Sequence, residues 1–330
     1  MCVKRHSVVI VGAGLAGLTA GRDLSEAGHD ILILEKARGP GGRTCTRRGN
    51  SNARLDHGCQ FISSASRQPG SDVAAWRRSK LMVPWNAKQS PGSPTPEFAG
   101  DHWAVGTPTM SVVAKQLARG LNLLTQWQVD SIERSGTGWC LTEKDGLRSY
   151  ESDLVILAAP APQVLSLLGE NTFCERERLH HASYHPVWSL LLEGPDIPAL
   201  PFDFYGSQTE PIQWLIAQHA RPDRAPDRAW VGLASYAWSL EHLEESHAVV
   251  VDELLASANR LAGVKLSGTG KVHRWRYGVV SNPVGIPVLV DTDQQLLACG
   301  DWCLGQTVEH AVQSGHEAAR AAMRVLSCDD

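Results

Sequence analysis

The sequence predicts an α/β fold with two domains, one built on a parallel sheet and the other on an antiparallel sheet. The run from Val8 to Val11 is apolar throughout, which is typical of a parallel strand buried on both faces. A glycine-rich turn follows this run and leads into an amphipathic segment. From about Asn171 the chain changes to short strand-like segments rich in Trp, Val and Leu, separated by Pro-rich connections.

The glycine-rich turn has the spacing G-x-G-x-x-G between strand and helix, which is a dinucleotide-binding pattern. Gly12 allows the sharp turn, Gly14 leaves room for a pyrophosphate against the backbone, and Gly17 lets the helix pack close to the strand. Leu15 and Ala16 open the helix, where free N–H groups and the helix dipole meet a phosphate.

The next strand, Ile31 to Leu34, ends at Glu35. An acidic side chain about 20 residues past the glycines accepts hydrogen bonds from an adenosine ribose. Because Glu35 would repel a 2′-phosphate, the pattern predicts a Rossmann-like site for the ADP part of NAD or FAD and excludes NADP there.

A second glycine motif follows, with Glu35-Lys36 leading to Arg38-x-x-Gly41-Gly42-Arg43. It resembles the GG-doublet motif of the FAD-dependent amine oxidase and phytoene desaturase class. The resemblance implies FAD in an elongated pose, bound by a Rossmann-like domain of the GR2 type with a p-hydroxybenzoate-hydroxylase-like architecture. The chemistry agrees, because adjacent glycines expose N–H groups and Arg43 can neutralise a pyrophosphate bidentately.

Length and composition limit the kinds of partner and the cell compartment that we expect. The chain has 330 residues, 43% hydrophobic residues and a formal net charge of −4, which is enough for two cores and argues against nucleic acid as a partner. No apolar run is long enough for a transmembrane helix, and the N-terminus leads straight into the first strand without a signal peptide. We therefore expect a cytoplasmic protein with no membrane partner. Its eight cysteines lack a C-x-x-C pair, so we interpret them as reduced thiols and expect no metal site.

The string Asp56-His57-Gly58-Cys59-Gln60-Phe61 resembles the D-x-G-A-Q-Y/F segment of the renalase branch of this class. In that branch the segment runs beside the flavin. The resemblance implies that Gln60 hydrogen-bonds the flavin ring and that Phe61 packs near it. For Phe61 alone, an ordinary buried aromatic is the simpler interpretation.

The hydrophobic pattern in the rest of the chain predicts both helices and strands. Two strands around Val129 and Gly138 resemble the β-meander of such flavoproteins, with Val129 near the adenine. Elements expected elsewhere are helices at about 71–80, 110–119, 160–168 and 247–264, and strands at 153–159, 185–192, 212–218, 230–238 and 272–277.

The last segment returns to the first domain. A strand from Leu296 runs into Gly300-Asp301, and in this class the aspartate bonds the ribityl chain of FAD. A long helix then opens with Val308, Glu309, His310 and Ala311, where its N-terminus can stabilise negative charge on the flavin. We expect residues 1–62, 106–170 and 285–330 to form the FAD-binding domain. Residues 63–105 and 171–284 would form the substrate-binding domain.

The resemblance to bacterial renalase-like proteins covers nearly the whole chain, and its most specific string is Cys299-Gly300-Asp301-Trp302-Cys303. That string implies non-covalent FAD, although amine oxidases attach flavin to a cysteine late in the chain. Two positions depart from the pattern. His310 replaces a small residue, and Gly305-Gln306-Thr307 replaces G-G-R or S-G-R.

Renalases oxidise the 2- and 6-dihydro isomers of NAD(P), so the resemblance implies an FAD-dependent oxidoreductase with a dinucleotide substrate and O₂ as oxidant. Hydride would pass to flavin N5, and reoxidation by O₂ would release NAD(P)⁺ and hydrogen peroxide. Such chemistry needs stacking and orientation more than acid–base catalysis. The candidates for the substrate side are Gln60, Trp214, His273, Arg274, Tyr277 and Trp302.

Strand alternation limits this set, because His273 and Arg274 point to opposite faces and at most one of them can face the substrate. Two other functions stay open. One is an amine oxidase or desaturase acting on an amine or apolar substrate, and the other is a non-catalytic FAD-binding protein in redox sensing.

Overall fold

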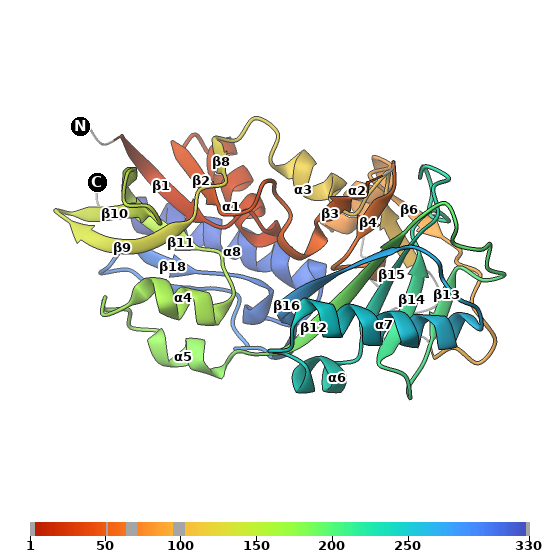
Figure 1. Cartoon of the computed structure of the whole chain (residues 1–330). Helices are drawn as coiled ribbons and strands as arrows, with labels where there is room; N and C mark the ends of the chain where they lie inside the picture. The colour runs from red at the N-terminus through yellow and green to blue at the C-terminus, as the bar shows by residue number, and fades with distance from the viewer. Residues whose placement is uncertain (1–3, 51, 64–70, 95–102, 328–330) are drawn as a thin grey trace. The chain divides into compact units, whose positions relative to one another are not determined.

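The computed structural model describes residues 4–50, 52–63, 71–94 and 103–327 (Figure 1). The chain divides into two compact units, the first comprising 1–42, 114–183 and 280–330, and the second 43–113 and 184–279. Segments 43–62 and 106–113, which we expected in the FAD-binding domain, group with the second unit. Segments 64–70 and 95–102 of the expected substrate-binding domain lie outside the described residues.

The first unit is built on a mainly parallel sheet in the order β17-β18-β11-β1-β2-β8. β1 pairs in parallel with β2 on one side and β11 on the other, and β17 pairs antiparallel to β18 at the edge. A β9–β10 hairpin extends β11, as the predicted β-meander required. The strands are β1 (Arg5–Val11), β2 (Ile31–Glu35), β8 (Leu123–Thr125), β9 (Val129–Ser135), β10 (Gly138–Glu143), β11 (Ser149–Leu157), β17 (Leu289–Asp291) and β18 (Leu296–Ala298).

Two helices distant in sequence, α1 (Leu15–Glu26) and α8 (Val308–Ser327), pack against each other in this unit (Figure 1). A Cβ at Gly315 would overlap the carbonyl oxygen of Ala16, so α8 needs a glycine where it crosses α1. His316 and Asp23 join the same helices through a 2.6 Å contact between Nδ1 and Oδ2. Shorter helices of this unit are α4 (Ala161–Leu168), α5 (Arg176–His181) and the 3-10 turn η3 (Asp301–Cys303).

The second unit is built on a sheet in the order β13-β14-β15-β12-β16, in which β13, β14, β15 and β12 pair antiparallel to one another. The strands of this sheet are β12 (Ser183–Glu193), β13 (Phe204–Gly206), β14 (Ile212–Ala217), β15 (Ala229–Ala234) and β16 (Thr269–Asn282). The predicted α/β fold with a separate antiparallel-sheet domain is therefore confirmed.

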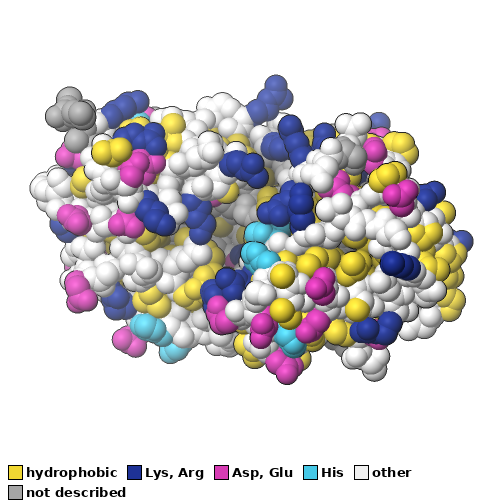
Figure 2. Space-filling model, in the orientation of Figure 1, with side chains coloured by type: hydrophobic (Ala, Val, Ile, Leu, Met, Phe, Trp, Pro, Cys, Tyr) yellow, Lys and Arg dark blue, Asp and Glu magenta, His cyan; other side chains and the backbone are white. Residues whose placement is uncertain are grey.

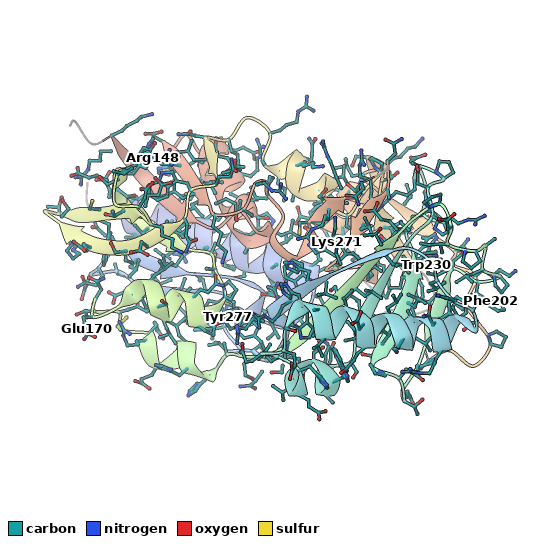
Figure 3. The ribbon with its side chains drawn as sticks, viewed as in Figure 1. Arg148, Glu170, Phe202, Trp230, Lys271 and Tyr277 are labelled. Atoms are coloured by element: carbon teal, nitrogen blue, oxygen red, sulfur yellow. The ribbon has the colours of Figure 1, made fainter. Side chains whose placement is uncertain are left out.

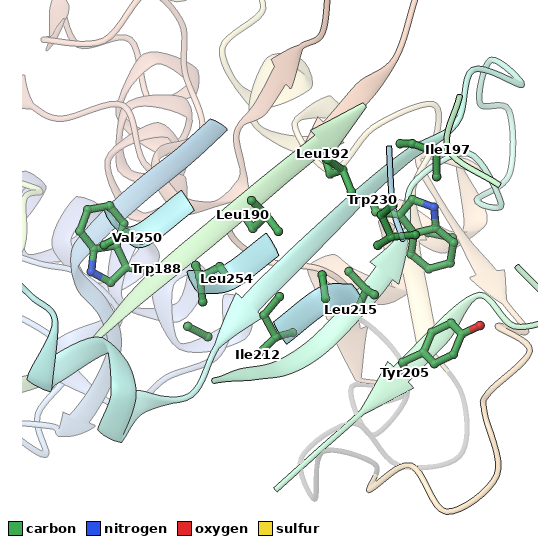
Figure 4. Packing of buried hydrophobic residues seen from close by; sticks show 14 residues of the cluster. Trp188, Leu190, Leu192, Ile197, Tyr205, Ile212, Leu215, Trp230, Val250 and Leu254 are labelled. Carbon is green, nitrogen blue, oxygen red and sulfur yellow. The ribbon is translucent and has the colours of Figure 1, made fainter. Parts of the chain in front are cut away.

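The core of the second unit lies between this sheet and α7 (His247–Ala262), as Figure 4 shows. Alternate residues of β12, namely Trp188, Leu190 and Leu192, point toward the apolar stripe of α7, where Val250 and Leu254 are fully buried. This is the pattern expected when one sheet face meets one helix face.

Smaller elements complete the second unit. They are β3 (Thr46–Arg48) paired with β4 (Arg54–Asp56), the sheet of β5 (Ile62–Ser63), β7 (Trp103–Gly106) and β6 (Met82–Trp85), and the helices α2 (Asp72–Arg78) and α6 (Tyr236–Glu241). The 3-10 turn η1 (Gly42–Thr44) and the helix α3 (Val112–Leu117) each span a point in the sequence at which the chain passes from one unit to the other.

One predicted strand was too long. We expected a strand from 230 to 238, but β15 ends at Ala234 and α6 begins at Tyr236. Ser235 causes the change, because its side chain accepts a hydrogen bond from the Trp238 N–H at 3.3 Å and caps the helix.

Among the described residues, no helix combines the length and the apolar character needed to cross a bilayer. Acidic and basic side chains are interspersed over the face in Figure 2. Within the same residues, Cys45, Cys59, Cys140, Cys174, Cys299 and Cys303 are free thiols, whereas Cys2 and Cys328 lie outside the described part.

Candidate functional site

The turn after β1 is shaped by close backbone approaches. Gly12 has φ +108°, and a Cβ there would lie 2.7 Å from the carbonyl oxygen of Ala158. A Cβ at Gly17 would overlap the carbonyl oxygen of Gly12. Both positions therefore need glycine for the fold itself, as the motif predicted.

Gly14 differs, because a Cβ there would meet no heavy atom within 4 Å. It is the N-cap of α1 and offers no side chain to the orphan N–H groups of the first helical turn. Gly41 donates to the carbonyl of Ala13 at 2.8 Å, and Gly42, at φ +51°, approaches the Gly14 Cα. Bare backbone with helix N–H groups beside it is the arrangement that binds a pyrophosphate.

Glu35 lies at the end of β2 and is held by two backbone donors. Its Oε2 accepts from the Ala13 N–H at 2.8 Å, and its Oε1 accepts from the Ala37 N–H at 2.7 Å. Each carboxylate oxygen keeps a further acceptor site, which suits the two hydroxyls of a ribose. The residues thus fit the adenosine diphosphate part of FAD.

Two other cofactor candidates sit nearby in this unit. Lys36 donates from Nζ to Gln163 Oε1 at 3.2 Å, so its side chain reaches toward α4. Val129 is buried at the start of β9, two residues after Trp127, whose N–H donates to the Glu35 carbonyl.

At the C-terminal end of the first unit, Gly300 donates to Ser314 Oγ at 3.0 Å and Asp301 is nearly buried. Trp302 is 1% exposed, and its indole N–H donates to the Ala159 carbonyl at 3.0 Å. This indole is therefore packed in the core of the first unit, and the predicted place of Trp302 on the substrate side stays a prediction.

α8 begins at Val308, so Val308, Glu309 and Ala311 lie in its first turn. His310 folds back there, with its Nδ1 3.1 Å from Thr307 Oγ1. A Cβ at Gly305 would lie 2.6 Å from the same ring. His310 and the segment Gly305-Gln306-Thr307, where the chain departs from the renalase pattern, thus form one local arrangement in which Gly305 makes room for the imidazole and Thr307 contacts it.

In the second unit, the segment 56–61 is tied to the Gly-Gly-Arg motif. Cys59 donates to the carbonyl of Arg43 at 2.8 Å, and a Cβ at Gly58 would overlap that carbonyl. The Arg43 side chain donates to the Gly278 carbonyl at 3.3 Å.

A buried polar network lies under this segment. Asp56 has no exposed surface and accepts from Arg221 at 2.9 Å and from Arg224. It also accepts from Thr46 Oγ1 at 2.5 Å and from the Met110 N–H at 3.2 Å. One carboxylate thus neutralises one of two buried guanidinium groups. Burial lowers the pKa of Arg221 to about 10.

Gln60 belongs to the same network. Its amide donates to the carbonyls of Asp56 and Gly58, at 2.5 and 3.0 Å, and accepts from Arg221 and Gln218, at 2.7 and 3.2 Å. A primary amide has two donors and one oxygen with two acceptor sites, and all four are used. The predicted bond from the Gln60 side chain to the flavin ring stays a prediction, and it would replace one of these four bonds.

Phe61 and Trp214 belong to an aromatic group in the second unit. Phe61 is buried and stacks on Trp103 with ring centroids 4.5 Å apart, and Trp214 lies 6.2 Å from Phe61. Trp214 is partly exposed, so it keeps a surface that a ligand can contact.

Strand β16 shows the expected alternation. Arg274 and Arg276 both contact Glu244 on one side, and Arg274 also lies over Trp188. On the other side, His273 and Trp275 lie 4.2 Å apart between ring centroids. Arg274 thus contacts Glu244 and Trp188, whereas His273 lies on the other side of the strand; the predicted substrate role of one of the two residues stays a prediction.

His57 joins this second side of β16. Its ring lies 4.8 Å from His273 and 5.2 Å from Trp275, and Trp275 donates to the His57 carbonyl at 2.7 Å. Burial, reinforced by nearby positive charge, lowers the pKa of His57 and of His273 to about 4. Both imidazoles are therefore neutral at pH 7. Farther along the strand, Tyr277 packs edge-on to Tyr184.

Sequence reasoning missed Arg47, Arg221, Arg224 and Trp275. Arg221 and Arg224 stand in a Pro-rich connection that reads as a surface loop, and their partner Asp56 lies about 165 positions away. For these two residues, the only signal in the sequence was the presence of Arg221 and Arg224 close together in one short connection. Among the described residues, no three His, Cys, Asp or Glu side chains form a group that could hold a metal.

A Rossmann-like unit with an open glycine turn, and with a carboxylate placed where it can accept from a ribose, is typical of dinucleotide-dependent proteins. The family model described as NAD(P)-binding Rossmann-like domain matches residues 10–74, and that described as flavin containing amine oxidoreductase matches residues 93–323. The chain belongs to the flavin-containing amine oxidoreductase family, and its cofactor is FAD.

Similar proteins agree with this assignment. A segment is 53% identical over 45 residues to the L-amino-acid oxidase of Mus musculus, and another comparison gives 52% over 46 residues to lysine-specific histone demethylase 1 homolog 1 of Arabidopsis thaliana. These matches cover 14% of this chain in each case, and only 7% and 6% of the relatives. Cyclohexylamine oxidase from Brevibacterium oxydans IH-35A has the same fold, with a TM-score of 0.71 at 14% identity over 98% of this chain and 99% of that chain.

Proposed function

We propose that this protein is a renalase-like, FAD-dependent oxidase of the 2- and 6-dihydro isomers of NAD(P). When bound, FAD supplies a two-electron acceptor that takes a hydride from C2 or C6 of the dihydropyridine, and O₂ carries the electrons away as hydrogen peroxide. The oxidised product is NAD(P)⁺, and no other co-reactant is needed.

The observation that carries the proposal is the chemistry of the second side of β16. His57 and His273 have a pKa of about 4 and are already neutral at pH 7, so they do not form an acid–base pair poised near neutrality. Trp275 and Tyr277 add aromatic surface to the same side. Neutral rings and aromatic walls orient a flat heterocycle, which is the main requirement for hydride transfer.

Two buried cysteines support the proposal that FAD is bound non-covalently. Cys299 and Cys303 are fully buried, and desolvation raises the pKa of both thiols. A buried, protonated thiol is a poor nucleophile, so neither cysteine is suited to attach the flavin.

The second candidate is oxidation of an amine, and family membership together with the fold of cyclohexylamine oxidase favours it. One experiment distinguishes the two proposed reactions. The purified yellow protein is mixed anaerobically with 2-, 4- and 6-dihydroNAD(P) and with a panel of amines, while the visible flavin band is followed. We expect the 2- and 6-isomers alone to bleach the band, with colour restored by O₂. Bleaching by amines alone would transfer the protein to the second candidate, and no bleaching by either would favour the non-catalytic alternative.

A further inference from the structure

Arg47 on β3 makes no ion pair with any residue that the structure describes. It pairs with Leu55 of β4, two residues before His57, so Arg47 and His57 are diagonal neighbours on one face of this ribbon. Arg47 is half-buried. Its positive charge acts on both His57 and His273.

His57 adds an unused polar atom beside this charge. The residue is 4% exposed, and within the ranges that the structure describes its Nδ1 has no hydrogen-bond partner. Its Nε2 faces Cys45 Sγ at 3.6 Å. A buried polar atom without a hydrogen-bond partner raises the free energy of the folded protein. A ligand that hydrogen-bonds to this atom removes that cost and therefore binds more tightly.

His273 completes a three-sided arrangement. Its ring meets His57 edge-on at 4.8 Å and lies 4.2 Å from Trp275, which forms an aromatic wall. Both imidazoles are neutral at pH 7, so each carries one N–H donor. Asp56, whose carboxylate also acts on His57, is paired with two arginines, so this network carries an excess of positive charge.

The sign of the local charge selects the ligand. A metal cation is disfavoured by Arg47, and a protonated amine is repelled for the same reason. Lys271 lies two residues before His273 on β16 and donates to Asn50 in the β3–β4 turn (Figure 3). The Glu193 carboxylate accepts from the Asn50 N–H in the same turn, so Lys271 adds no net charge to the site. The Arg47 cation and two N–H donors suit an anionic oxygen group.

We propose that Arg47, His57 and His273 form a binding site for the anionic group, phosphate or carboxylate, of a small-molecule ligand, with Trp275 as its aromatic wall. The inference rests on the proposed function in one respect: it takes the ligand to be the substrate that the enzyme oxidises. A dinucleotide carries phosphates and meets the requirement, whereas a simple amine does not.

Direct binding tests the site without turnover. The flavin-loaded protein is titrated with inorganic phosphate and, separately, with acetate, while imidazole ¹H–¹⁵N signals are followed by NMR. His57→Gln and His273→Gln variants assign the two signals. We expect saturable shifts of both signals, with phosphate or acetate binding more tightly according to which group the site takes. Arg47→Gln should weaken binding at least about tenfold.

The matched control is Arg48→Gln, since Arg48 is the next residue of β3 and is exposed on the opposite side. It should bind as the parent does. Imidazoles that respond to neither anion overturn the site, and so does an Arg48→Gln protein that loses as much affinity as Arg47→Gln.

Kinetics separate this inference from the proposed function. With 6-dihydroNAD, Arg47→Gln should raise KM at least about tenfold and leave kcat unchanged. With the phosphate-free 6-dihydronicotinamide riboside, KM should not change. If both substrates turn over with parental KM values in Arg47→Gln, the anion site fails and the function stands. If no dihydronicotinamide is oxidised but phosphate still shifts both imidazoles, the function fails and the anion site stands.

Discussion

Replacing Asp56 by asparagine tests the buried network most directly. The substitution keeps the shape of the side chain and removes its charge, which leaves Arg221 and Arg224 buried without a carboxylate. Arg221 loses an ion pair at 2.9 Å in which neither side chain has exposed surface. At an effective dielectric constant of about 20, Coulomb attraction at that distance is roughly 6 kcal/mol for each pair.

Reorganisation and water entry reduce that figure, and removing one partner of a buried pair typically costs about 3–5 kcal/mol. Asp56→Asn should therefore lose a large share of the roughly 5–15 kcal/mol that stabilises an ordinary domain. Equilibrium urea unfolding of the flavin-loaded protein, followed by far-UV circular dichroism and by flavin release, measures the loss.

The matched control is Glu244→Gln. Glu244 also contacts two arginines, Arg274 and Arg276, but its side chain is 69% exposed. Solvent screens such a pair, so its removal should leave the urea midpoint nearly unchanged. If Asp56→Asn shifts the midpoint no more than Glu244→Gln does, burial is not what gives the Asp56 network its stabilising effect.

Two further predictions concern proton uptake and the glycine cradle. The depressed pKa values of His57 and His273 mean that the unfolded chain binds protons that the folded protein does not, so unfolding free energy should fall as pH drops from about 6.5 to about 4. Urea unfolding across this range should show a smaller slope for His57→Gln than for the parent protein; equal slopes in the two proteins would contradict the assignment. Gly14→Ala should keep the parental melting temperature and lose flavin absorbance after gel filtration, because its Cβ enters open space, whereas Gly17→Ala should melt earlier because its Cβ meets backbone. Parental flavin content in Gly14→Ala would place the pyrophosphate elsewhere.

The nucleotide half of the site was predictable because its signals are local. Gly12, Gly17 and Glu35 act through backbone geometry within one β-α-β stretch, and periodicity alone identifies that stretch. The structure shows the close backbone approaches at Gly12 and Gly17 and the Ala13 N–H donating to Glu35, whereas the binding of a nucleotide by these residues stays a prediction.

The substrate side was harder to predict because its contacts join distant parts of the chain. Alternation along β16 showed that His273 and Arg274 diverge, but only the fold shows that Glu244 takes Arg274. From the sequence alone, a role for Gln60 at the flavin was plausible. Only the structure shows that Gln60 contacts Arg221, which lies 161 positions away in the sequence. Side-chain pairing over such separations has no periodic signature in a single sequence.

The discontinuous first unit has a consequence for biosynthesis. Its central strands, β1 and β2, leave the ribosome early, whereas β18 and α8 are among the last described elements to be made. Until then the outer edge of β11 lacks its parallel neighbour, and the face of α1 around Ala16 lacks the helix that covers it. The nascent chain thus carries an open strand edge and an uncovered apolar helix face through most of translation, and both features recruit chaperones or promote aggregation. Closure of this unit therefore waits for β18 and α8, and the early-made glycine cradle belongs to a unit that is completed only when these elements have been made.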